Sequence, residues 1–259
     1  ITAWRWIYRN SRRELVPVRH IHPIQLHDLY GIDSQKESVD RNLHQFVLGL
    51  PANHMLLTGA RGTGKSSLIK ALINRYADQK LRTVEVDKDA LITLPELTDI
   101  LADRPERFLI YCDDLSFASD EQQFRPLKAM LDGSIAAIPD NILICATSNR
   151  RHLLPEYFSE NLASHSIDGE IHPGEQVEEK ISLSERFGLW VTFYPFKQDQ
   201  YLHIVKRWID SLSESPVEPE AFREEALQFS LYRGSRSGRI AWQFARDWVG
   251  RQKLTQVLS

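Results

Sequence analysis

Cysteine is scarce in this chain of 259 residues, which contains two cysteines and two methionines. Cys112 and Cys145 each lie inside an apolar run, so we expect both to pack in the core as reduced thiols. They do not suggest the disulfide framework of a small secreted domain. This cysteine usage is typical of a cytoplasmic protein, and a start at Ile1 rather than at a methionine is typical of a trimmed or processed chain.

The sequence also lacks long hydrophobic runs and a large net charge. No apolar stretch approaches the roughly 18 to 20 residues that span a membrane, and no apolar signal segment follows a basic start, so we expect no membrane partner. The 32 Lys and Arg residues against 35 Asp and Glu residues leave a net charge of −3. This balance excludes the global positive field of a protein that coats nucleic acid, so any such binding must be local.

Short apolar runs of four to six residues recur along the chain as far as Pro195 and lack helical periodicity. Such runs are expected of strands that are buried on both faces of a parallel sheet. The predicted strands are His54–Thr58, Thr83–Val86, Phe108–Cys112, Ile142–Thr147 and Leu189–Phe193. Helical spacing between them, in residues 66–79 and 121–131, predicts a doubly wound α/β domain.

After Pro195 the pattern changes to helices only. The predicted helices are Gln198–Leu212, Glu218–Tyr232 and Ser237–Gln252. In the first helix, apolar residues recur at i, i+3, i+4 and i+7, which predicts a stripe that faces a core. This stripe consists of Tyr201, Ile204, Val205, Trp208 and Leu212. We therefore divide the chain into an N-terminal arm (1–23), an α/β domain (24–195) and a small helical domain (196–259).

The first 20 residues are basic and aromatic, with Trp4, Trp6 and Tyr8 interleaved among five arginines. This composition fits binding to nucleic acid. It also fits an arm that packs its aromatic side chains on its own domain or on a neighbour, which is the interpretation that we favour. Residues 156–185 are acidic and are expected to form a solvated loop.

Residues 59–66 fit the pattern G-x-x-x-x-G-K-[ST] between a predicted strand and a predicted helix, which is the context that a phosphate-binding loop requires. Its glycines let the backbone point successive N–H groups at phosphates, and the helix N-terminus adds its positive end. We expect Lys65 to reach the β- and γ-phosphates of ATP and the Ser66 hydroxyl to bind Mg²⁺. The candidate nucleotide-binding residues here are Gly59, Ala60, Arg61, Gly62, Thr63, Gly64, Lys65, Ser66 and Ser67.

Two later strands end in polar residues, which a parallel sheet brings to the edge where ligands bind. The run 108–112 is followed by Asp113 and Asp114. We expect Asp113 to hold the Mg²⁺ shell and Asp114 to polarise an attacking water. Asn149 follows the strand Ile142–Thr147 closely, so its amide is predicted to hydrogen-bond the γ-phosphate or that water.

The order of these motifs resembles the AAA+ superfamily of phosphate-loop ATPases over residues 24–250. That resemblance implies an αβα sandwich with a parallel five-stranded sheet, then a small all-helical lid, in a homo-oligomer with shared ATP sites. It makes Arg186, in an Arg-Phe-Gly sequence, an arginine finger that reaches the ATP of a neighbouring subunit. Arg239 would contact the nucleotide of its own subunit, and Tyr30 and Ile32 would lie near the adenine base.

More narrowly, residues 51–53, 112–117 and 147–153 look like an uncharacterised bacterial family of predicted AAA+ ATPases, which has no agreed biological role. One departure from the wider superfamily is Asp114, because most AAA+ proteins have Glu at this position. The shorter side chain reaches less far toward an attacking water, which favours slow hydrolysis.

Three hypotheses are open. The first is an Mg²⁺-dependent ATPase that couples the nucleotide state to conformational change or to remodelling of a partner protein. The second is a nucleotide-controlled binding module with little turnover, which Asp114 favours. The third is a nucleic-acid loader, which is suggested by the arginines of residues 1–20 and by basic residues near the C-terminus, namely Arg233, Arg236, Arg239, Arg246, Arg251 and Lys253.

Overall fold

The computed structural model describes residues 2–9, 12–115, 121–132, 138–149 and 185–258. Its centre is a parallel array of five strands in the order β4-β5-β6-β3-β7. These strands are β3 (Met55–Gly59), β4 (Leu81–Val86), β5 (Arg107–Cys112), β6 (Ile142–Ser148) and β7 (Leu189–Phe193). All five were predicted from their apolar runs, with bounds that differ by two residues at most.

The sheet has seven strands in the described part of the chain, so the expected count of five was wrong. The two additional strands are β1 (Ala3–Arg9) and β2 (Arg12–Pro17). β1 lies parallel to β4, and β2 pairs with β1 in the antiparallel direction at the outer edge. Trp6 is buried, and its indole N–H donates to the Thr93 hydroxyl at 2.8 Å. The aromatic residues of the arm thus include one that anchors a strand in the sheet of its own domain.

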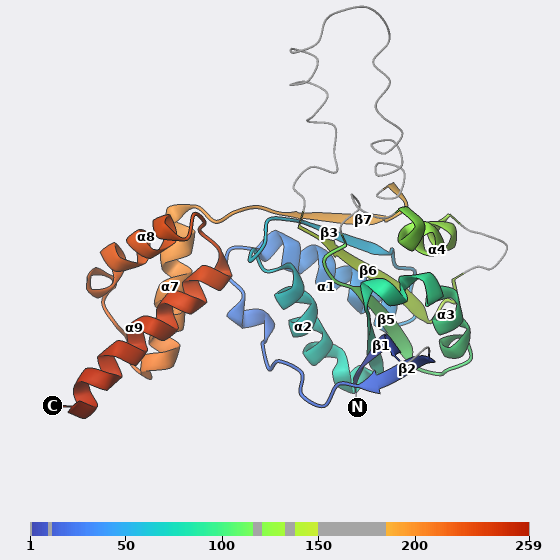
Figure 1. Ribbon diagram of the computed structural model, residues 1–259, viewed down its shortest axis with the longest axis horizontal. Helices are drawn as coiled ribbons and strands as arrows, with labels where there is room; N and C mark the ends of the chain where they lie inside the picture. The colour runs from blue at the N-terminus through green and yellow to red at the C-terminus, as the bar shows by residue number, and fades with distance from the viewer. Residues whose placement is uncertain (1, 10–11, 116–120, 133–137, 150–184, 259) are drawn as a thin grey trace, which may run out of the picture.

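Helices cover both faces of the sheet (Figure 1). One face carries α1 (Asp33–Val47) and α2 (Lys65–Tyr76), and the other carries the 3-10 segment η3 (Lys88–Thr93), α3 (Leu94–Ala102) and α4 (Glu121–Leu131). Neighbouring residues of a strand pack in different hydrophobic cores, because successive side chains point to opposite faces of the sheet. Leu57 packs in the α1 and α2 core, whereas Leu56 packs in the η3, α3 and α4 core.

Three helices follow the sheet and lie beside it (Figure 1). They are α7 (Gln198–Ser213), α8 (Arg223–Tyr232) and α9 (Gly238–Leu258), with a short 3-10 turn η4 (Pro219–Ala221) before α8. Of the predicted stripe on α7, Tyr201, Ile204 and Val205 are buried, whereas Trp208 and Leu212 are only partly buried. We call these three helices the lid. The domain boundaries 1–23, 24–195 and 196–259 stay a prediction.

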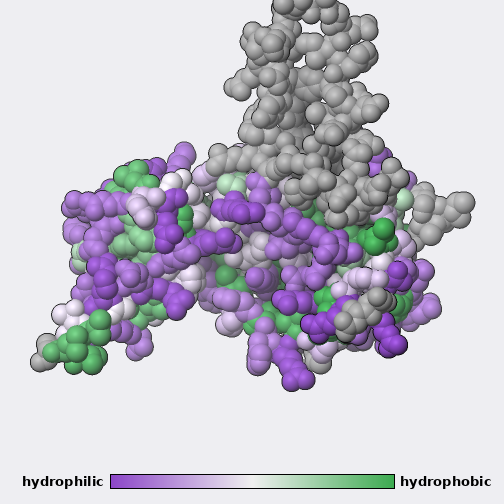
Figure 2. Space-filling model, viewed as in Figure 1, coloured by the Kyte–Doolittle hydropathy of each residue, from purple (hydrophilic) through white to green (hydrophobic). Residues whose placement is uncertain are grey.

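The surface is largely hydrophilic in the view of Figure 2, with an apolar patch at the free end of α9, where Leu254, Val257 and Leu258 are exposed. No helix in the described ranges is long and apolar enough to cross a membrane. Cys112 and Cys145 are buried free thiols, as predicted. The acidic stretch 156–185 lies outside the described residues except for its last residue.

Candidate nucleotide site

The loop between β3 and α2 has the backbone geometry of an anion cradle. Gly62 and Gly64 have φ angles of +77° and +107°, a region that side chains with a Cβ rarely adopt. At Gly59 a Cβ would fall 2.0 Å from the Phe193 carbonyl oxygen of β7. Glycine is therefore required there for β3 and β7 to pair up to the start of the loop.

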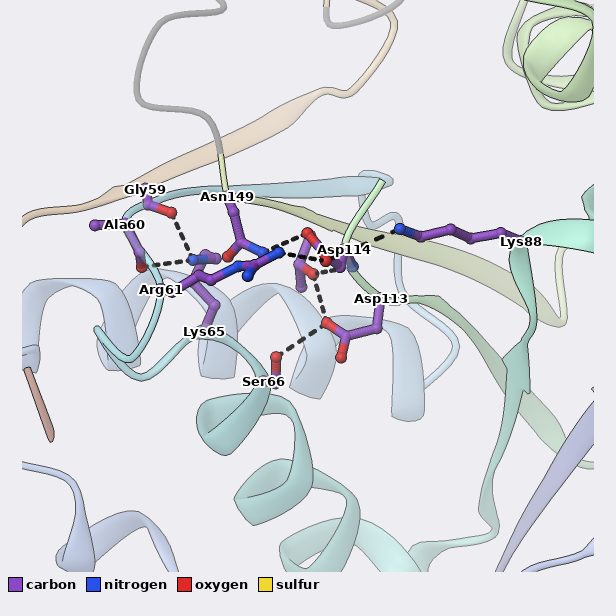
Figure 3. Close-up of polar contacts among 10 residues, drawn as sticks. Gly59, Ala60, Arg61, Lys65, Ser66, Lys88, Asp113, Asp114 and Asn149 are labelled. Carbon is purple, nitrogen blue, oxygen red and sulfur yellow. Dashed lines mark hydrogen bonds and ion pairs between the residues drawn. The ribbon is translucent and has the colours of Figure 1, made fainter. Parts of the chain in front are cut away.

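Lys65 begins α2 and lies almost completely inside this loop, with 5% of its surface exposed. Its ammonium group donates hydrogen bonds to the carbonyl oxygens of Gly59 at 2.6 Å and Ala60 at 2.9 Å (Figure 3). Burial lowers the pKa of Lys65 to about 8, although the nearby carboxylates of Asp113 and Asp114 oppose that shift. At neutral pH the group is thus still charged, and the loop holds a positive charge at its centre.

The Asp113 carboxylate accepts three hydroxyl donors on the same oxygen, Oδ1. They are Ser66 Oγ at 3.0 Å, Tyr111 Oη at 2.7 Å and Thr147 Oγ1 at 2.6 Å. Burial alone would raise the pKa of Asp113, but these hydrogen bonds outweigh it and lower the pKa below its ordinary value. Asp113 is thus held ionised next to the Ser66 hydroxyl. A carboxylate and a hydroxyl are oxygen ligands that Mg²⁺ accepts, so this pair fits the metal expected with ATP.

Asp114 is held by contacts to its backbone and to its carboxylate. Its φ angle is +53°, and its backbone N–H donates to Thr147 Oγ1 at 2.9 Å. The Asn149 amide donates to Asp114 Oδ1. On Oδ2, Arg61 approaches to 3.4 Å and Lys88 to 3.9 Å, and Figure 3 shows these two cations on opposite sides of the carboxylate. The candidate base is therefore surrounded by an amide donor and two cations.

These groups open into a cleft of about 680 Å³ between the sheet and the lid, a volume typical of small-molecule sites. Its polar end contains the loop 61–66, Asp113, Asp114 and Asn149, and Ser67 also lines it. Its other end is apolar and aromatic, and its lining there includes Tyr30, Ile32, Phe196, Ile204, Trp208 and Trp242. A cleft that is charged at one end and aromatic at the other matches the chemistry of a nucleoside triphosphate.

Tyr30 and Ile32 line the apolar end, where the resemblance placed them. The Tyr30 ring lies 3.9 Å from the Arg207 guanidinium carbon and meets the His203 ring edge-on at 5.7 Å. Both partners belong to α7, so the base end of the cleft is built jointly by the α/β layer and the lid.

Arg239 is in the first turn of α9 and lines the same cleft. Its position follows from a direct backbone contact, because the N–H of the preceding Gly238 donates to the Gly62 carbonyl at 2.8 Å. The lid therefore contacts the loop between β3 and α2 itself.

Arg186 is absent from the described residues that line the cleft. It precedes β7, whose first residue, Leu189, pairs with Met55, whereas Gly59 at the start of the loop pairs with Phe193. Four residues of strand separate these two pairs, or about 13 Å. Arg186 thus lies at the opposite end of the strands from the cleft, and there it forms an ion pair with Asp132.

Sequence reasoning missed several residues that shape the site. The Thr147 hydroxyl bonds the Asp113 carboxylate and the backbone N–H of Asp114, the Tyr111 hydroxyl bonds the Asp113 carboxylate, and Lys88 approaches the Asp114 carboxylate. Two of them had a usable signal, because residues two apart in a strand share a face: Tyr111 precedes Asp113 by two, and Thr147 precedes Asn149 by two. Lys88 lies in a different loop and gave no such signal.

The comparisons with known proteins agree with this geometry. Residues 1–252 match the family model "Protein of unknown function (DUF815)". No protein of curated function matches the sequence.

Among solved structures, the Holliday junction branch migration motor RuvB of Thermotoga maritima is similar, with a TM-score of 0.57 and 18% identity over 92% of this chain and 68% of that one. Caenorhabditis elegans PCH-2 is similar over 73% of this chain and 50% of that one, with a TM-score of 0.50 and 17% identity. The matched share of the sequence and this shared architecture lead to one conclusion: the chain belongs to the DUF815 family, a family of unknown function, and has an α/β fold of the AAA+ type.

Proposed function

We propose that this protein is an Mg²⁺-dependent AAA+ ATPase whose ATP sites are shared between subunits. In this proposal, the nucleotide state is coupled to lid movement or to remodelling of a partner protein. One observation carries the proposal. Lys65, the Ser66–Asp113 pair and the Asp114–Asn149 pair converge on the polar end of one cleft.

Each of these groups has a task in binding. The backbone N–H groups of the loop and Lys65 bind the phosphates of ATP, and the aromatic end of the cleft takes the base. Ser66 and Asp113 would hold Mg²⁺, which would supply neutralisation of the phosphate charge.

The remaining groups act on the reaction. Asp114 orients the attacking water, and Asn149 fixes the Asp114 carboxylate through Oδ1. Arg239 reaches the γ-phosphate from the lid of the same subunit. Arg186 stabilises the transition-state charge in the neighbouring subunit, in agreement with its position at the far end of β7 from its own cleft.

Two substitutions separate binding from hydrolysis. Lys65→Ala should greatly weaken ATP binding in a calorimetric titration, because it removes the positive charge of the loop. Asp114→Asn keeps the side-chain size, so it should bind ATP as the wild type does and fail to release phosphate in a steady-state assay. Lys253→Ala, near the exposed end of α9, is the matched control and should change neither result. Unchanged ATP affinity in Lys65→Ala would refute the phosphate-loop assignment, and wild-type turnover in Asp114→Asn would place the base elsewhere.

A nucleotide-controlled binding module is the second candidate, and the surroundings of Asp114 favour it. The carboxylate is one methylene shorter than the usual Glu, and Arg61, Lys88 and Asn149 all approach it. Such a group would activate water poorly, and ATP binding would then fix the lid without turnover. Asp114→Glu distinguishes the two candidates. A rise in phosphate release would show that short reach limits a true ATPase, and negligible release in both forms would support the binding module.

The nucleic-acid loader has less support from the structure. Three of the arginines that suggested it form ion pairs within the chain: Arg5 with Glu85, Arg13 with Glu96, and Arg251 with Glu225 and Asp247. These contacts reduce the local positive charge available for phosphate contacts.

A further inference from the structure

The turn that carries Arg186 is held on three sides. Phe187 is 4% exposed and packs in the same core as Leu127 and Met130 of α4. A Cβ at Gly188 would fall 2.3 Å from Asn53 Oδ1, so the turn lies directly against Asn53. The backbone N–H of Leu189 then donates to the His54 carbonyl at 3.1 Å. The backbone that presents Arg186 is therefore fixed to α4 and to the beginning of β3.

Asp132 is also held by a backbone hydrogen bond. It follows the last residue of α4, and its N–H donates to the Lys128 carbonyl at 2.9 Å, which continues the helical pattern. Its carboxylate pairs with Nε of Arg186, and the two side chains are 39% and 22% exposed. Both members of the pair thus stand on elements whose apolar neighbours share one core.

Pairing at Nε has a geometric consequence. Nε is the guanidinium nitrogen nearest the aliphatic stem, so a carboxylate held beside Nε restricts the positions that the guanidinium group samples. An arginine side chain otherwise samples many rotamers, and fixing it costs conformational entropy. A finger that is oriented before the subunits meet avoids that cost at the interface.

We propose that Asp132 is a positioning residue that orients Arg186 toward the nucleotide of the neighbouring subunit. This inference rests on the proposed function, in which Arg186 acts across a subunit interface. Asp132 does not touch the nucleotide. It acts through Arg186 and affects the hydrolysis step rather than ATP binding.

The primary variant is Asp132→Asn, which keeps the shape of the side chain and removes its charge. Since a displacement of about 1 Å costs on the order of 10²-fold in rate, we expect kcat to fall about 10- to 100-fold while KM for ATP stays unchanged. In Arg186→Ala, kcat should fall further, by about 10³-fold. Asp132→Glu restores the carboxylate and should recover part of the lost turnover. The matched control is Glu96→Gln, which removes another exposed ion pair, Arg13–Glu96, and should leave kcat unchanged.

Mixing experiments give a readout that a merely structural role would not affect. An equimolar mixture of Asp132→Asn and Asp114→Asn contains interfaces that join an intact cleft of the first to an intact finger of the second. Activity should therefore rise above the mean of the two separate proteins. Asp132→Asn mixed with Arg186→Ala should show no such rise, because both lack a working finger. A labelled-subunit assay establishes that subunits exchange.

Each alternative result has a definite meaning. A higher kcat in Asp132→Asn would show that Asp132 restrains Arg186, and would overturn the inference. So would wild-type kcat in this variant, or a loss of kcat without recovery in exchanging mixtures with Asp114→Asn. If Arg186→Ala itself keeps wild-type turnover, the shared-site proposal fails. If Arg186→Ala is inactive and Asp132→Asn is not, only the role of Asp132 fails.

Discussion

The hydroxyl of Thr147 contacts both aspartates of the candidate site. It accepts the backbone N–H of Asp114 and donates to Asp113 Oδ1. The hydroxyl thus connects the Asp113 carboxylate to the backbone that presents Asp114. We therefore expect position 147 to affect the stability of the protein and, under the proposed function, its phosphate release.

Thr147→Val keeps the side-chain shape and removes this hydroxyl. It leaves the Asp114 N–H without this acceptor and deprives Asp113 of one donor, so the free energy of unfolding should fall by about 1–3 kcal/mol. The midpoint of urea unfolding measures this loss, and phosphate release should fall with it. The control is Thr83→Val on β4, because Thr83 Oγ1 is buried without a hydrogen-bond partner among the described residues. Thr83→Val should be neutral or stabilising, and equal effects of the two variants would refute the role of the Thr147 network.

At the scale of single elements, His54 connects three strands of the sheet. It immediately precedes β3, its Nδ1 accepts the N–H of Ile144 in β6 at 3.1 Å, and its carbonyl accepts the N–H of Leu189 at the start of β7. Burial lowers the pKa of His54 below its ordinary value. Only the neutral ring accepts the Ile144 N–H, so protonation breaks this connection.

This connection predicts a stability that depends on pH. The pKa of His54 is about 6.5 in the unfolded chain and lower in the folded protein. The stabilisation from its hydrogen bond is therefore complete above about pH 6.5. It is lost as the pH falls through the folded pKa. Urea unfolding at pH 7.5 and pH 5.5 should show this decrease. His54→Asn, which keeps an acceptor that does not titrate, should show a smaller decrease, whereas the exposed control His20→Asn should behave as the wild type. An unchanged pH dependence in His54→Asn would assign the effect to other groups.

The sequence predicted some strands of the sheet and missed others. The strands β3 to β7 were predictable because burial on both faces leaves uninterrupted apolar runs. β1 and β2 were not, because β2 is the edge strand, β1 lies next to it, and both carry exposed charged residues that interrupt their apolar runs. In β1, Trp4, Trp6 and Tyr8 alternate with Arg5, Ile7 and Arg9, and this alternation is the strand signal that the arginine content concealed.

At the scale of the whole molecule, the candidate site also consists of residues that the sequence predicted and residues that it did not. Residues that end a strand or belong to the phosphate loop were predictable, since the topology alone brings them to one edge. The aromatic end of the cleft was not, because Trp208 was assigned to a core stripe of α7 and Trp242 to no site. Their rings meet edge-on at 4.5 Å and line the cleft. A periodic pattern on one helix cannot show that part of its stripe faces a cleft shared with another domain.

Because the Gly238 N–H donates to the Gly62 carbonyl, opening of the lid can be followed by hydrogen–deuterium exchange at this amide. The Gly238 amide is protected by an acceptor on the other side of the cleft, so its deuterium uptake reports separation of the lid from the loop. If ATP binds only the closed form, at 100 times its Kd it stabilises that form by about 2.7 kcal/mol, and uptake at this amide should slow by about 100-fold. The Ala226 amide, which is bonded within the lid to the Phe222 carbonyl at 2.9 Å, is the internal reference and should exchange at the same rate with and without ATP. Unchanged uptake at Gly238 under saturating ATP would mean that the lid opens and closes independently of the nucleotide. Slower uptake would let this amide report lid opening without a covalent label.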